Sequence, residues 1–181
     1  MEIRVSLVLL ALLLVAAAAL SASRPCAVIE PANHDVRALA ELEDAAGQTR
    51  DDLALTRRLT STYLRLGQAG LAIAAVRSAP PELARDPLLT HRLSQAYEAS
   101  GRVDDALSTA QLAKARCRSS SGAALCSLAT QAAIEMHEEA LTMLVRWGVQ
   151  EPRRDSRTAL AYRLAQRTAR IASLGLSAPA E

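Results

Sequence analysis

The chain has 181 residues, a mass of 19.2 kDa and a near balance of 21 Lys and Arg against 19 Asp and Glu. This balance argues against a polybasic nucleic-acid-binding tail or an acidic disordered arm, and the length fits one modest domain. Hydrophobic residues make up 50% of the chain but aromatic residues only 2%. A core of Ala, Leu and Val is therefore expected, which suits closely packed helices better than a sheet.

An apolar segment opens the chain. Residues 5–23 contain no charged side chain, follow a short basic start and end in the small residues Ser21, Ala22 and Ser23. This pattern is typical of a secretion signal, which is cleaved after a small-x-small site. The segment is longer than most cleaved signals and shorter than a full membrane span. Residues 1–23 are thus expected to be a signal peptide cleaved after Ser23 or, alternatively, an inner-membrane anchor with the remaining chain in the periplasm.

Residues 24–34 hold two prolines and no periodic pattern, which predicts a linker. Beyond them the apolar periodicity, the caps and the breakers predict an all-α chain. The expected helices cover residues 35–46, 52–66, 69–79, 87–100, 103–117, 123–135, 137–147 and 156–173. Asp86 is predicted to cap the helix that Pro87 opens. The helix 156–173, with Leu160, Leu164, Ile171 and small alanines turned inward, is predicted to cover the end of the core, and residues 175–181 form a tail.

Superposing the sequence on itself gives one clear offset, of 34 residues. The shared residues are Leu59, Tyr63, Gly67, Ala72 and Ala79 in one segment and Leu93, Tyr97, Gly101, Ala106 and Ala113 in the next. With 3 Tyr and 7 Gly in the chain, agreement of both types at one offset indicates a repeat rather than an Ala-rich coincidence. One period further on the match weakens, because Gln131 takes the place of the tyrosine and Glu135 that of the glycine.

These segments resemble the tetratricopeptide repeat family, whose unit is a pair of antiparallel helices. The resemblance implies an α-solenoid over residues 35–174, with its best units at 53–86 and 87–120. It also implies a concave groove that binds an extended peptide or a partner protein. Carried over by position, the groove residues are Arg57, Ser61, Arg65, His91, Gln95 and Glu98. Arg57 and Arg65 are expected to hold a partner carboxylate, so reversing both charges should weaken capture and leave the fold intact.

Cys117 and Cys126 flank a loop rich in Ser and Gly between two predicted antiparallel helices. Outside the cytoplasm such a pair is expected to form a disulfide, which would stabilise this hairpin. The alternative is that they are two small, unlinked core residues. Cys26 is left over, and the sequence does not decide its role.

Nothing in the sequence predicts an enzyme, a metal site or a cofactor site. His34, His91 and His137 are far apart, without the spacing of a zinc site, and no phosphate-binding loop or nucleophile elbow is present. The compartment and the scarcity of aromatic residues disfavour nucleic acid. The arginine-rich stretch from Arg153 to Arg170 is expected to be a solvated face, with a patch for acidic partners or anionic lipids as the alternative.

Two functions follow from this interpretation. The first is a non-enzymatic protein-interaction adapter or scaffold in a bacterial cell envelope, with residues 1–23 as a possible membrane attachment. The alternative is a structural subunit that is permanently buried in a larger envelope assembly and is soluble only with its partner.

Overall fold

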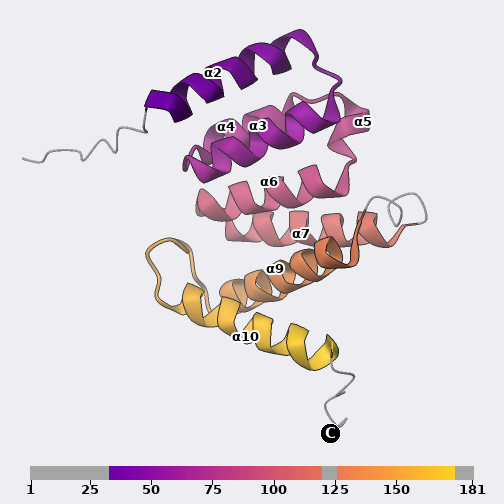
Figure 1. The fold of residues 1–181 in the computed structure, drawn as a ribbon. Coiled ribbons are helices and arrows are strands. Elements are labelled where there is room, and N and C mark those ends of the chain that lie inside the picture. Colours follow the sequence, from indigo (N-terminus) through magenta and orange to yellow (C-terminus); the bar gives the residue numbers. More distant parts are fainter. Residues whose placement is uncertain (1–32, 120–125, 174–181) are drawn as a thin grey trace, which may run out of the picture. The chain divides into compact units, whose positions relative to one another are not determined.

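The computed structural model describes residues 33–119 and 126–173, and within them all regular structure is helical (Figure 1). The helices are α2 (Asn33–Gln48), α3 (Leu53–Arg65), α4 (Ala69–Arg77), α5 (Pro81–Ala84), α6 (Pro87–Ala99), α7 (Val103–Arg118), α9 (Leu128–Arg146) and α10 (Arg157–Ser173). The predicted all-α class is confirmed. The predicted signal or anchor, most of the linker, and the tail lie outside the described residues.

Residues from Arg37 onward belong to one compact unit, which contains α3 to α10. Within it, α3 packs on α4 and α6, α4 on α6, α6 on α7, α7 on α9, and α9 on α10. Most contacts therefore join helices that are neighbours in the chain, and α3 also lies against α6, the helix that carries the matching tyrosine (Figure 1).

Two helices begin in the same way, one repeat length apart. The side chains of Asp52 and Asp86 each accept a hydrogen bond from the backbone N–H three residues later, at 3.0 and 2.9 Å, and so cap α3 and α6. The hydroxyls of Thr56 and Thr90 donate to the carbonyls of these same aspartates, at 2.9 and 2.7 Å. Both threonines are buried. The buried hydroxyl of each threonine thus finds a hydrogen-bond acceptor within its own helix.

Three helices also end in the same way. After α3, α6 and α9 the chain passes through a glycine with φ of 72°, 79° and 65°, at Gly67, Gly101 and Gly148. The following amide then donates to a carbonyl in the last helical turn: Gln68 to Tyr63, Arg102 to Tyr97 and Val149 to Leu144, at 2.8, 2.9 and 3.0 Å. Glycine adopts this left-handed conformation without the strain that a Cβ atom would cause.

The third ending lies 47 residues after Gly101, so the 34-residue spacing is broken after the second pair of helices. The prediction of two helices, over 123–135 and 137–147, is wrong. The structure has one uninterrupted helix of 19 residues, α9, capped by Ser127. Its sequence contains no Gly or Pro, so nothing forces a turn at the positions where Gln131 and Glu135 meet the 34-residue period.

Small residues lie where the helices pack most closely. Ala72, Ala106 and Ala110 are fully buried, and so are Ala161 and Ala165 of α10. The expectation that Leu160 of α10 faces inward is wrong, because its side chain is 42% exposed. The inward position predicted for the alanines of this helix is confirmed at Ala161 and Ala165, since residues four apart share a face, and Leu164 is half-buried. Larger buried side chains, such as Leu141 and Leu144 of α9, fill the remaining space.

Candidate functional site

Arg57, the first of the predicted groove residues, is engaged within the fold. Its guanidinium reaches across from α3 and binds both carboxylate oxygens of Asp86, with Nε to Oδ1 at 3.0 Å. The side chain of Asp86 is only 3% exposed, and it also caps α6. Reversing the charge of Arg57 would place two carboxylates together, one of them buried. Because of this pairing, we expect the change to destabilise the fold, although the sequence predicted that the fold would stay intact.

Two more predicted groove residues, His91 and Glu98 of α6, meet a residue of α9 and one of α10. The carboxylate of Glu98 accepts a hydrogen bond from the Tyr162 hydroxyl at 2.7 Å and lies 2.9 Å from Nε2 of His137. The rings of His91 and His137 meet edge to face with centroids 5.1 Å apart, and Tyr162 stacks on His137 at 6.2 Å. We call these four residues the polar cluster.

Burial dominates the chemistry of the polar cluster. It lowers the pKa of His91 from 6.5 to about 3, with smaller contributions from the charges of His137 and Arg92. Burial also raises the pKa of the Tyr162 phenol, and the negative charge of Glu98 acts in the same direction. His91 is therefore neutral and Tyr162 keeps its proton near pH 7.

The remaining predicted groove residues do not converge. Gln95 accepts a hydrogen bond from Arg92 on its own helix at 2.9 Å. Ser61 is half-buried and Arg65 is exposed at the end of α3. Neither side chain makes a hydrogen bond or ion pair within the described parts of the chain. The six positions thus divide into an ion pair, part of the polar cluster and isolated side chains, rather than forming one polar groove.

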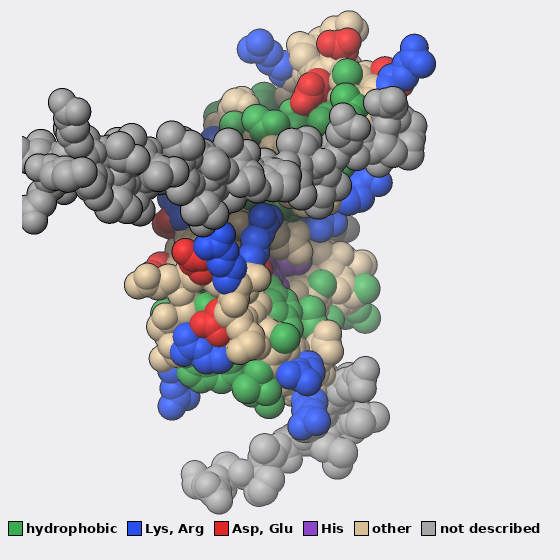
Figure 2. Space-filling model, turned by 90° about the vertical axis from the view of Figure 1, so that its left-hand side faces the viewer, with side chains coloured by type: hydrophobic (Ala, Val, Ile, Leu, Met, Phe, Trp, Pro, Cys, Tyr) green, Lys and Arg blue, Asp and Glu red, His purple; other side chains and the backbone are tan. Residues whose placement is uncertain are grey.

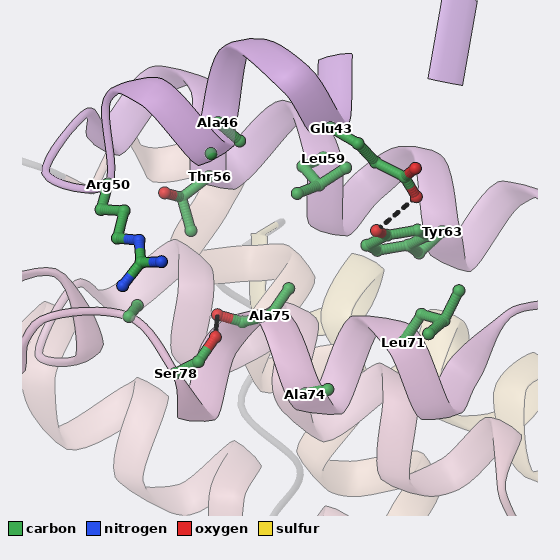
Figure 3. A pocket seen from close by; sticks show the side chains of 12 residues that line it. Glu43, Ala46, Arg50, Thr56, Leu59, Tyr63, Leu71, Ala74, Ala75 and Ser78 are labelled. Carbon is green, nitrogen blue, oxygen red and sulfur yellow. Dashed lines mark hydrogen bonds between the residues drawn. The ribbon is translucent and has the colours of Figure 1, made fainter. Parts of the chain in front are cut away.

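A different hollow lies between α2, α3 and α4 (Figure 3). It has a volume of about 470 Å³, within the range of ligand pockets. We call it the α2–α4 groove. The lining residues are Glu43, Ala46, Gly47, Arg50, Thr56, Leu59, Tyr63, Leu71, Ala74, Ala75, Ser78 and Ala79.

One side of the α2–α4 groove is a stripe on α4. Leu71, Ala74, Ala75 and Ser78 follow the spacing of a single helical face. Leu71 is 47% exposed, so its side chain presents apolar surface to this hollow. The opposite face of α4, with Ala72 and Val76, is buried in the core. The sequence of α4 could have indicated the groove, because this helix has apolar residues such as Leu71 on a second face beside the buried one.

The two ends of the α2–α4 groove are polar. At one end the hydroxyl of Tyr63 donates to Glu43 at 2.7 Å, and burial together with this carboxylate raises the pKa of Tyr63 to about 12. At the other end stands Arg50, which is exposed (Figure 3). Its guanidinium makes no hydrogen bond or ion pair with residues 33–119 or 126–173. The groove therefore has an apolar middle, a hydrogen-bonded acid at one end and, at the other, a cation that is unpaired within the described residues.

The predicted disulfide is present. Cys117, in the last turn of α7, is bonded to Cys126, which lies just before α9, with their Cα atoms 5.6 Å apart. Both half-cystines are buried with Ala113 and Ile134. The bond therefore joins the α7–α9 connection to the core, while Cys26 lies outside the described residues.

Other predicted features occupy ordinary surface. Arg154 pairs with Glu151, and Arg157 pairs with Asp155, whose pKa is lowered chiefly by the hydrogen bonds from Arg157. Positive and negative side chains are interspersed on the face shown in Figure 2. In the described portion no three His, Cys, Asp or Glu side chains are grouped so as to bind a metal ion. None of the helices described there has both the length and the apolarity of a membrane span.

No protein-family model matches the chain, and no curated protein or solved structure shows significant similarity to it.

Proposed function

We propose that this chain is a protein-interaction module built as a tetratricopeptide-like solenoid, exported to the bacterial periplasm or anchored at its inner membrane. The 34-residue spacing of the caps at Asp52 and Asp86 and of the turns at Gly67 and Gly101 supports the repeat. The neighbour-to-neighbour packing of α3 to α10 is what such an array requires. The apolar, uncharged segment at residues 5–23 supports export.

The proposal of a protein-binding function depends mainly on the α2–α4 groove. Its middle offers Leu59, Leu71 and the alanines of α4 to an apolar guest, and Arg50 offers a charge at one end. An apolar stripe beside an open hollow gains free energy when a partner covers it, by about 25 cal/mol for each Å² removed from water. We infer that the guest is a short apolar segment of another protein, with an acidic group placed against Arg50.

The size of the groove fits such a guest. A volume of about 470 Å³ accommodates a few side chains rather than a whole helix, so the contact is an anchor within a larger and weaker interface. Small residues on α4 allow the guest backbone to approach closely, while Leu71 supplies the exposed apolar area. Arg50 would set the direction of the guest, because a guanidinium binds a carboxylate through two parallel hydrogen bonds.

We expect Leu71→Glu to reduce partner capture at least tenfold in crosslinking and pull-down from intact envelopes, because it places a charge in the apolar middle of the groove. Leu112→Glu is the matched control, since Leu112 on α7 is 45% exposed against 47% for Leu71 and lies outside the groove. Both variants should melt like the wild type, as surface changes usually alter stability by no more than about 0.5 kcal/mol. Equal capture by both variants would remove the groove from the proposal.

A structural subunit remains the second candidate, favoured by exposed apolar side chains outside the groove. Leu112, Leu128 and Leu160 are 45%, 84% and 42% exposed on three different helices. Surfaces of this kind are buried when a chain is a permanent part of an assembly. A purified chain that is monomeric and unfolds cooperatively supports the adapter, whereas a chain that stays soluble only with its partner supports the subunit.

A further inference from the structure

The polar cluster joins three helices through groups that can take up or release protons. His91 and Glu98 come from α6, His137 from α9 and Tyr162 from α10. Because the ionised carboxylate of Glu98 can only accept, Nε2 of His137 is the donor in their 2.9 Å contact.

Two ring nitrogens in this cluster have no partner in the described part of the chain. Nδ1 of His137 and Nε2 of His91 are both buried, and neither makes a hydrogen bond with residues 33–119 or 126–173. His137 is 3% exposed and His91 is 8% exposed. At His91 an unprotonated Nε2 tolerates this position better than a protonated one, because an imidazolium there would bring a full charge and an N–H donor without an acceptor.

Among the described residues, no carboxylate near His91 is free to stabilise a positive charge on its ring. Glu98 already accepts hydrogen bonds from two groups. The cationic side chains that reach α6 or α9 from neighbouring helices are each bonded to another residue. They are Arg57 of α3 with Asp86, Arg77 of α4 with Tyr97, Arg116 of α7 with Thr90 and Ala84, Lys114 of α7 with Glu138, and Arg118 of α7 with Glu135. Arg92, next to His91, adds a positive charge that opposes protonation.

We propose that the polar cluster is an acid-sensitive junction, which holds α9 and α10 against α6 at neutral pH and releases them as the pH falls below about 6. In the open state His91 reaches water and regains its ordinary affinity for protons, so acid favours opening. The disulfide keeps the start of α9 beside the end of α7. Opening is therefore confined to α10 and the part of α9 that carries His137.

Proton linkage gives the direction in which pH changes the stability of the closed state. Burial holds the pKa of His91 at about 3 in the closed state, against about 6.5 in an open chain. Between these values the open state binds one more proton, so closure is fully stable above about pH 6.5 and loses stability as the pH falls. The opening constant should rise about tenfold for each pH unit in this window. The range from pH 7.5 to 5 avoids the titration of ordinary carboxylates.

Hydrogen exchange of the full chain tests the junction, with rates corrected for the intrinsic effect of pH. Between pH 7.5 and 5, amides of α10 and the second half of α9 should lose protection by at least tenfold, while those of α3 and α4 keep theirs. The variant His91→Gln cannot be protonated and should lose this response. His34→Gln also removes one histidine but lies outside the cluster, and it should respond like the wild type.

Two results overturn the proposal. One is that the amides of α9 and α10 in the wild type are as well protected from exchange at pH 5 as at pH 7.5. This result contradicts the proposal even if His91→Gln fails to fold. The other is a folded His91→Gln variant with the same acid response as the wild type. Neither result depends on the α2–α4 groove or on partner capture.

Discussion

Replacing Asp86 with alanine should lower the free energy of unfolding by about 2–4 kcal/mol. The side chain is 3% exposed, caps α6 through the amide of Leu89 at 2.9 Å and receives two hydrogen bonds from Arg57. Loss of an N-cap costs about 0.5–2 kcal/mol, and breaking a buried ion pair costs about 3–5 kcal/mol. Because the side chain of Arg57 is 32% exposed, it can partly regain water, which reduces the second contribution.

Asp52→Ala is the matched control for this change. Asp52 caps α3 with the same geometry, at 3.0 Å, but its carboxylate has no arginine partner among the described residues. Its loss should cost about 1 kcal/mol, the value of a cap alone. Urea unfolding of both variants measures the difference. Equal losses would mean that the Arg57–Asp86 pair adds nothing to stability.

Reduction of the Cys117–Cys126 disulfide should lower the free energy of unfolding by roughly 2.5–3 kcal/mol, the entropy of closing a loop of about ten residues in the unfolded chain. For a domain of this size the melting temperature should fall by roughly 5–12 °C. The loss is a large share of the stability of a typical domain, which is about 5–15 kcal/mol. Calorimetry or thermal circular dichroism with and without reductant measures it.

The double variant Cys117→Ala/Cys126→Ala serves as the control for the reductant. It should melt near the reduced wild type and should not respond to further reductant. Mass spectrometry of non-reduced peptides should find Cys117 linked to Cys126. Peptides in which either cysteine is linked to Cys26 instead would contradict this account of the bond.

The sequence was sufficient to predict features that depend on a few neighbouring residues. The cap at Asp86, the end of a helix at Gly148 and the helices α3, α6 and α7 follow from local rules, and the structure has them within two residues of the expected bounds. The Cys117–Cys126 disulfide was accessible for the same reason, because the two cysteines are only 9 residues apart.

Features that depend on distant contacts were missed. A helical projection places Arg57 on a solvated face, but it cannot show that Asp86, 29 residues later, will lie beside it. The same holds for Glu98, whose partners His137 and Tyr162 come from two other helices. The break predicted within α9 failed for a related reason: the 34-residue period was extended past the disulfide loop, where the chain no longer follows it.

Site-specific photo-crosslinking in intact envelopes tests the central claim, that partner proteins dock in the α2–α4 groove. A photoreactive residue at Ala74 would lie in the groove, and one at Ser108 would occupy the matching position of the next helix pair on α7. A third, at Arg65, would test the face of α3 on which the sequence placed the peptide groove. We expect a protein adduct from position 74 and none from position 108 or 65. An adduct from position 65 or 108 without one from position 74 would contradict the claim.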